Sequence, residues 1–308
     1  MHLLSIREMQ TSQIESLISL SRKMKKAVRD GTQLPSYKGK VVGMLFLEDS
    51  TRTRVSFELA ARKLEFDVTS FGIQGSSMSK GESLKDTVLT LKHEGIDALV
   101  MRHRSSGAPY LAARFFEGPI LNGGDGMHEH PTQALGDAVT ILEHKPSISG
   151  LRVSIVGDVM HSRVARSNIW LLSKLGAEVR LIGPRTLIPR YPGHLPASVH
   201  YDLSVGIADA DVVMCLRLQN ERMESGLISS TGEYASLYQI NSKSIKAAKP
   251  DCLVMHPGPM NRGLEIDDST ADGKNSVINQ QVENSVFVRM AAFDWAFTES
   301  NNKQGAIA

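Results

Sequence analysis

The segment "VVGMLFLEDSTRTRVSFE", residues 41–58, joins an apolar run to a stretch of helical spacing. Residues 41–47 are apolar apart from one glycine and predict a buried strand. Val55, Leu59 and Leu64 follow at intervals that predict a helix over residues 54–65. A strand that leads directly into a helix favours an α/β fold with a parallel sheet.

The same alternation continues along the chain in two series. Apolar runs at 41–47, 67–73, 97–103 and 118–124 predict one set of strands, and runs at 151–158, 178–184, 211–215 and 252–257 predict a second. The turn-rich segment "KPSISG", residues 145–150, separates them. We therefore predict two α/β domains, each with a mainly parallel sheet flanked by helices and with the active site in the cleft between them. The first domain comprises residues 1–145 and a C-terminal helix at about 282–308, and the second comprises residues 146–281.

Composition excludes several classes of protein. The 308 residues are 41% hydrophobic and 22% charged, with a formal net charge of +2, which is typical of a globular protein without a basic face for nucleic acid. We expect neither a signal peptide nor a membrane span, because no apolar stretch approaches about 18 residues. Cys215 and Cys252 lie in apolar runs and are predicted to be buried thiols. A cytoplasmic protein without disulfides is the expectation.

The four residues Ser50, Thr51, Arg52 and Thr53 stand where the predicted helix begins. Backbone N–H groups, hydroxyls and a guanidinium at a helix N-terminus form a site suited to an anion. An N-cap beside a surface arginine is the alternative for this stretch taken alone.

Polar residues also follow other predicted strands. Arg102 and His103 end the run at 97–103, where parallel sheets bind ligands. The stretch "NGGDGMHEHPTQ", residues 122–133, places His128, His130 and Gln133 around a helix start. The two histidines resemble a metal pair, but no further ligand lies at a suitable spacing, so we expect no metal. His130 and Gln133 are better suited to hydrogen-bond a carbonyl and an amide.

The second half of the chain adds further cations. Arg163 follows "VGD", and Arg217 and Gln219 follow the strand at 211–215. The glycine pattern G-x-G-x-x-G is missing after "VGD", so a dinucleotide site is not expected. Lys80 lies in the polar loop "SSMSKGES", which could act as a lid or reach a neighbouring site. Cations at strand ends of a nearly neutral protein suggest one polyanionic substrate, or two anionic substrates, between the domains.

Seven motifs in this order resemble the aspartate/ornithine carbamoyltransferase family: "STRTRVSFE", "KGES", "MRH", "GDGMHEHPTQ", "VGDVMHSRVARS", "LRLQNER" and "HPGP". The resemblance extends over nearly the whole chain and is stronger to the aspartate branch. It implies a carbamoyl-phosphate domain and an aspartate domain, in a homotrimer whose neighbouring chains share active sites.

The resemblance also implies roles for individual residues. The phosphate of carbamoyl phosphate would be bound by Ser50, Thr51, Arg52, Thr53 and Arg102. Its carbonyl oxygen would be polarised by Thr53, Arg102 and His130, and its NH₂ group held by Gln133 and the backbone carbonyls of Pro257 and Gly258. L-Aspartate would be bound by Arg163, Arg217 and Gln219, and by Lys80 of the adjacent chain.

The implied reaction is attack of the aspartate amine on the carbamoyl carbon, in pyrimidine (UMP) biosynthesis, without a metal, a covalent intermediate or an organic cofactor. Regulatory chains or a dihydroorotase could join the trimer. Two alternatives remain at this point: transfer to ornithine or another amino acid, and a catalytically silent relative that serves as a scaffold. The arginines of the second half suit a dicarboxylate, and the "HPGP" turn differs from the "HCLP" turn of the ornithine branch.

Overall fold

A computed structural model describes residues 1–72, 81–219 and 227–305 of the chain. The chain divides into two compact units, unit 1 with Met1–Gly136 and Glu283–Ala308, and unit 2 with Asp137–Val282. The chain passes from unit 1 to unit 2 between Gly136 and Asp137, within the helix α5 (Pro131–His144). The sequence predicted this boundary near residue 145, just after the end of that helix. Each unit is an α/β layer structure, which confirms the predicted fold class.

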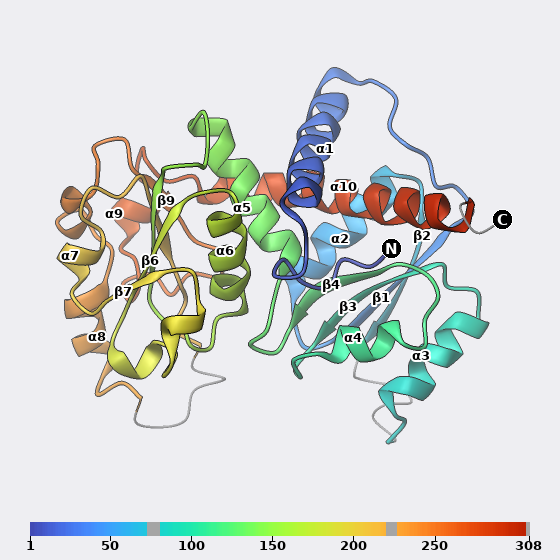
Figure 1. Ribbon diagram of the computed structural model, residues 1–308, viewed down its shortest axis with the longest axis horizontal. Helices are drawn as coiled ribbons and strands as arrows, with labels where there is room; N and C mark the ends of the chain where they lie inside the picture. Colours follow the sequence, from blue (N-terminus) through green and yellow to red (C-terminus); the bar gives the residue numbers. More distant parts are fainter. Residues whose placement is uncertain (73–80, 220–226, 306–308) are drawn as a thin grey trace. The chain divides into compact units, whose positions relative to one another are not determined.

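Unit 1 contains a four-stranded sheet in the order β2-β1-β3-β4, with all strands parallel. Its elements in chain order are α1 (Thr11–Asp30), β1 (Val41–Leu47), α2 (Thr51–Lys63), β2 (Asp67–Gly72), α3 (Leu84–His93), β3 (Ala98–His103), α4 (Ala108–Ala113) and β4 (Ile120–Asp125), with most of α10 (Ile278–Gly305). Helices α2 and α10 lie on one face of this sheet, with α1 on the far side of α10, and α3 and α4 lie on the other face (Figure 1).

The burial of β1 explains why its sequence is a continuous apolar run. Leu45 and Leu47 belong to the apolar cluster that β1 forms with α3, α4 and the neighbouring strands. Met44 and Phe46 are also buried, so the strand is covered on both faces. On the α2 side, the ring of Phe57 meets that of Phe293 edge to face at 5.9 Å, which joins α2 to α10.

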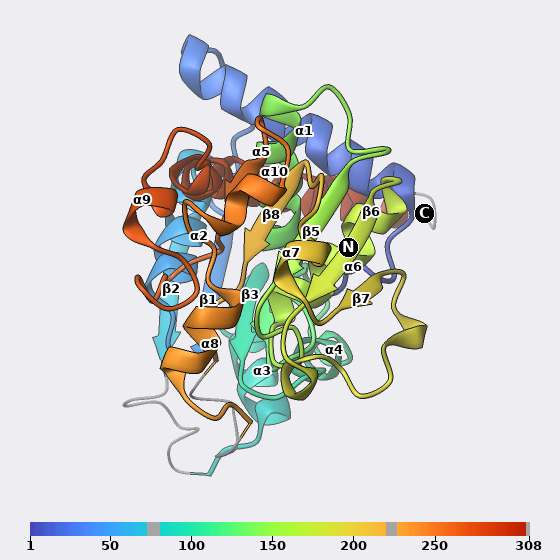
Figure 2. The same cartoon turned by 90° about the vertical axis from the view of Figure 1, so that its left-hand side faces the viewer.

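Unit 2 contains a five-stranded parallel sheet in the order β7-β6-β5-β8-β9. Its strands are β5 (Arg152–Val156), β6 (Glu178–Ile182), β7 (Ser198–His200), β8 (Val212–Cys215) and β9 (Leu253–Met255). Its helices are most of α5 (Pro131–His144), α6 (Arg163–Lys174), α7 (Leu203–Gly206), α8 (Thr231–Tyr238) and α9 (Asp268–Ala271), with 3-10 turns η2 (Arg185–Leu187), η3 (Pro192–His194) and η4 (Ser244–Ala247). Figure 2 shows α7 in front of this sheet and α6 behind it.

Both sheets have a point where the chain reverses the direction in which strands are added. In unit 1, β2 lies on one side of β1 and β3 on the other, so the reversal falls between β1 and β3. In unit 2 it falls between β5 and β8. Open parallel sheets bind ligands beyond the carboxyl ends of the strands at such points. The topology therefore marks one candidate half-site on each unit.

Each predicted apolar run contains a strand. Both cysteines are free and buried, as predicted. Among the helices within the described ranges, none is long and apolar enough to cross a membrane.

Candidate active site

The half-site of unit 1 begins at the N-terminus of α2. Ser50 is the N-cap residue, with extended backbone angles of φ −166° and ψ 96°, and α2 starts at Thr51. The Ser50 hydroxyl makes no capping hydrogen bond to α2 within the portion of the chain that the structure covers. The first turn contains no acidic residue and includes Arg52 and Arg54. These observations favour the anion-site interpretation over a simple helix cap.

Arg102, near the end of β3, lies beside this helix start. Its Nη1 donates to Thr53 Oγ1 at 3.4 Å and to the Gly123 carbonyl of β4 at 3.2 Å. Its Nη2 donates to Glu48 Oε1 at 3.0 Å. The side chains of Arg102 and Glu48 are 12% and 20% exposed. The structure thus brings Arg102 and Thr53 together, as the sequence predicted.

His130 and Gln133 lie at the start of α5 and are both buried. The His130 carbonyl accepts the N–H groups of Gln133 and Ala134 at 3.1 and 3.3 Å, so His130 occupies the cap position of the helix. His128 Nδ1 instead donates to Asp125. No cluster of three or more potential metal ligands occurs among the residues that the structure describes.

His103 is a further ring at the same sheet edge. Its Nδ1 accepts the Ser105 N–H at 2.8 Å. Burial lowers the pKa of His103, which keeps this ring neutral at neutral pH.

The half-site of unit 2 is built on the loops after β5 and β8. Asp158, fully buried, accepts the His161 N–H at 3.1 Å and approaches His161 Nδ1 at 2.8 Å. Its second oxygen accepts the Gln219 N–H at 3.3 Å, and the Gln219 side chain donates to the Arg217 carbonyl at 3.2 Å. Asp158 therefore ties together the two loops that contain the predicted aspartate-binding residues.

Arg163 is the first residue of α6 and is buried. The Ser162 side chain caps this helix by accepting the Ala165 N–H at 3.1 Å. Burial lowers the pKa of Arg166, one turn further on. As in α2, the first turn of α6 contains arginines and no acidic residue.

Gly157 allows the loop after β5 to approach the loop after β8. Its φ is +125°, and a Cβ at this position would lie 2.8 Å from the Leu216 carbonyl oxygen. Only glycine fits both the backbone conformation and this distance. This close approach accounts for the glycine of the "VGD" sequence.

The turn at Pro257 and Gly258 follows β9 and is held by His256. The Gly258 N–H donates to His256 Nδ1 at 2.8 Å, so the proton of the neutral ring lies on Nε2, which is 3.2 Å from Glu265 Oε1. The His256 N–H donates to Gln281 Oε1 at 2.9 Å. These contacts fix the peptide units whose carbonyls are predicted to face the substrate.

Four acidic residues of these half-sites did not emerge from the sequence: Glu48, Asp125, Asp158 and Glu265. Glu48 directly follows β1, Asp125 ends β4, and Asp158 lies two residues after β5, and this position was the signal that could have identified these three. Lys80 was predicted in the site and lies outside the described residues.

Comparisons with known proteins agree with this geometry. Residues 1–143 match the family described as "Aspartate/ornithine carbamoyltransferase, carbamoyl-P binding domain", and residues 149–296 match the corresponding "Asp/Orn binding domain". The chain is 49% identical over 290 residues to an aspartate carbamoyltransferase catalytic subunit of Moorella thermoacetica, covering 94% of both proteins. It is 51% identical over 295 residues to the same subunit of Granulibacter bethesdensis, covering 95% of this chain and 93% of that protein.

Solved structures show the same likeness. Aspartate transcarbamoylase of Trypanosoma cruzi, in complex with N-(phosphonacetyl)-L-aspartic acid, matches with a TM-score of 0.85 and 31% identity over 95% of this chain and 94% of that chain. Ornithine carbamoyltransferase of Pyrococcus furiosus matches with a TM-score of 0.84 and 29% identity over 95% of each chain. The chain therefore belongs to the aspartate/ornithine carbamoyltransferase family.

Proposed function

We infer that this chain transfers the carbamoyl group of carbamoyl phosphate to the amine of L-aspartate, giving N-carbamoyl-L-aspartate and phosphate. The observation that carries the inference is the pair of half-sites at the reversal points of the two sheets, with arginines at the start of α2 and of α6. Relatives about 50% identical are aspartate carbamoyltransferase catalytic subunits, and the Trypanosoma cruzi enzyme was also solved with carbamoyl phosphate and aspartate.

Unit 1 supplies the groups for carbamoyl phosphate. The phosphate would be bound by hydroxyls, first-turn N–H groups and guanidinium groups of Ser50, Thr51, Arg52, Thr53 and Arg102. The contact between Arg102 and Thr53 supports this assignment, because it places a charged donor and a hydroxyl at the same helix N-terminus. The carbonyl oxygen would be polarised by Thr53, Arg102 and His130.

Unit 2 supplies the groups for L-aspartate and for the carbamoyl NH₂. Arg163 and Arg217 would pair with the two carboxylates, and Gln219 would support them. The carbonyls of Pro257 and Gly258, with Gln133 of unit 1, would accept hydrogen bonds from the NH₂ group. Transfer requires both half-sites to act on one pair of substrates, and the interdomain position of the active site is part of this proposal.

The chemistry needs positioning and charge stabilisation alone. The amine nitrogen attacks the carbamoyl carbon, the carbonyl oxygen gains negative charge, and the bond between carbon and the phosphate oxygen then breaks. The departing phosphate takes the proton that the amine loses. A pH–rate profile that His130→Ala lowers without changing its shape would support this proton acceptor over a histidine base.

The assay that tests the function supplies carbamoyl phosphate with L-aspartate or with L-ornithine and measures phosphate release and the carbamoylated product. We expect turnover with L-aspartate alone. Turnover with ornithine alone would replace the proposed acceptor, and no turnover with either amino acid would support the silent-scaffold alternative.

We further propose a cytoplasmic homotrimer in which Lys80 of one chain completes the aspartate site of its neighbour, in pyrimidine biosynthesis. Lys80→Ala and Arg52→Ala should each nearly abolish activity, whereas mixed trimers should recover part of it. Mixed trimers without any recovery would contradict a shared site. Co-purification of regulatory chains or of dihydroorotase would identify a larger assembly.

A further inference from the structure

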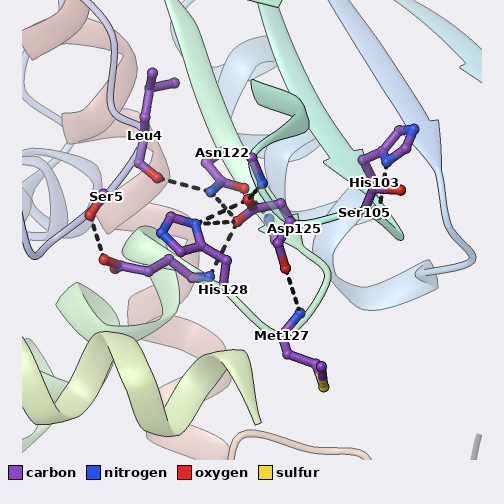
Figure 3. Close-up of polar contacts among 12 residues, drawn as sticks. Leu4, Ser5, His103, Ser105, Asn122, Asp125, Met127 and His128 are labelled. Carbon is purple, nitrogen blue, oxygen red and sulfur yellow. Dashed lines mark hydrogen bonds and ion pairs between the residues drawn. The ribbon is translucent and has the colours of Figure 1, made fainter. Parts of the chain in front are cut away.

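The N-terminal segment, residues 3–7, runs along the outer edge of β4 in unit 1. The Leu3 N–H donates to the Ile120 carbonyl, and the Asn122 N–H donates to the Leu3 carbonyl, both at 2.9 Å. Asn122 Nδ2 donates to the Leu4 carbonyl at 2.9 Å, as Figure 3 shows. This segment therefore extends the sheet beyond its last named strand.

Glu129 connects this segment to the loop that precedes α5. Its Oε1 accepts the Ser5 hydroxyl at 2.5 Å and the Arg7 N–H at 3.1 Å, and its Oε2 accepts the Ile6 N–H at 2.9 Å. Glu129 is 2% exposed. Three donors from consecutive residues thus converge on one buried carboxylate, which gives the contact a fixed geometry.

Asp125 fixes the other end of the same loop. Asn122 Nδ2 and the Gly107 N–H each donate to it at 2.7 Å, and His128 Nδ1 lies 3.1 Å from its Oδ2 (Figure 3). The Asp125 N–H donates to the Glu129 carbonyl, and the Glu129 N–H donates to Asp125 Oδ1, both at 3.2 Å. The backbone of Glu129 is therefore held from within the loop, and its side chain from the N-terminal segment.

His130 follows Glu129 directly and caps α5. We propose that Glu129 is a positioning residue, which sets the orientation of His130 toward the carbamoyl carbonyl through its contacts with residues 5–7. This inference rests on the proposed function, because it takes His130 as the group that polarises the carbonyl. Glu129 itself does not contact the substrate in this proposal.

Glu129→Gln tests the inference with little change of shape. An amide has a single acceptor oxygen, so it serves either the Oε1 donors or the Oε2 donor and turns an N–H toward the other. We expect kcat to fall about tenfold or more, because small displacements of a catalytic group have large effects on rate. The inhibition constant of inorganic phosphate should stay within about twofold of wild type, because the residues proposed to bind phosphate lie at the start of α2 and in β3 rather than in α5. If Glu129→Gln instead destabilised unit 1 as a whole, phosphate binding would weaken together with kcat.

A double-mutant cycle with His130→Ala separates positioning from other effects. If Glu129 acts through His130, the variant with both substitutions has the kcat of His130→Ala alone. Multiplied losses, or a kcat of Glu129→Gln equal to wild type, would overturn the inference. Glu117→Gln is the matched control, because Glu117 is exposed and pairs with Lys92 on the surface.

Two other outcomes would refute the claims on which the role of Glu129 rests. Wild-type protein without turnover would refute the proposed function itself, and a fully active His130→Ala variant would refute the role of His130.

If Glu129→Gln does not fold, Ser5→Ala removes one of the three donors to Glu129 and keeps the carboxylate. Its kcat should fall about threefold in the wild-type background and not at all in the His130→Ala background.

Discussion

Replacement of Arg102 by methionine should affect activity and stability through two different partners. Arg102 donates to Thr53 and Gly123, and to Glu48, which directly follows β1. If Arg102 stabilises the developing negative charge, as proposed, its loss should lower kcat about 10²- to 10³-fold. Loss of the partner leaves the Glu48 carboxylate, 20% exposed, without this cation.

The expected loss of stability in Arg102→Met depends on how deeply the Arg102–Glu48 ion pair is buried. Exposed ion pairs contribute about 0–1 kcal/mol, and removal of one partner from a buried pair costs about 3–5 kcal/mol. With side chains 12% and 20% exposed, this pair lies between these limits, and we expect Arg102→Met to lower the free energy of unfolding by about 2 kcal/mol. Adding Glu48→Gln removes the carboxylate charge that has lost Arg102 and should restore about 1 kcal/mol without restoring activity.

Urea unfolding of the four variants of this cycle provides the measurement. In a Trp170→Phe background, fluorescence reports on Trp295, which is buried in α10 of unit 1. Activity is measured on the same preparations. If the Arg102→Met/Glu48→Gln variant is no more stable than Arg102→Met, or if Arg102→Met keeps kcat within threefold of wild type, the reasoning is wrong.

Three further predictions concern unit 2. Arg217→Met should raise KM for L-aspartate about 10- to 100-fold with little change in KM for carbamoyl phosphate; equal changes in both would contradict the assignment. Glu265→Gln weakens the support of His256 and should lower the thermal unfolding midpoint and kcat together, and normal values of both would exclude this role. Burial raises the pKa of Cys252 to about 12 and also raises that of Cys215. Above about pH 8.5 the thiols ionise in the unfolded protein but stay neutral in the folded protein. The free energy of unfolding should therefore fall as pH rises, by up to about 1.4 kcal/mol per pH unit for each thiol. If replacement of both cysteines by alanine left this dependence of the unfolding free energy on pH unchanged, the reasoning would be contradicted.

Most of the strands could be predicted from the sequence because strands covered on both faces are continuous apolar runs. β2, which has no buried residue, was predicted from a weaker pattern. β7, of three residues and partly exposed, has no such run and was not predicted. The short helices α7 and α9 are also missing from the prediction, because four residues are too few to show a helical period.

The candidate site was predictable where residues follow strands, and less so where a partner comes from a distant part of the sequence. Arg102 lies near the end of β3 and Thr53 in the helix after the neighbouring strand β1, so their proximity follows from the parallel sheet. Glu129 contacts Ser5, 124 residues away, through an N-terminal segment with no strand pattern. Its motif neighbour His130 was identified, but the function of the glutamate depends on tertiary contacts that local spacing does not encode.

The arginines in the first turns of α2 and α6 have a consequence for the protein without substrate. A helix N-terminus carries partial positive charge, so each cation there is unfavourable by about 0.3–1 kcal/mol, and Arg163 is buried as well. At the exposed start of α2, an acidic residue in place of Arg52 would interact more favourably with the helix end in the protein without substrate. In the proposed function, a bound substrate anion offsets this cost, so that selection for stability of the protein without substrate and selection for substrate affinity act in opposite directions at Arg52.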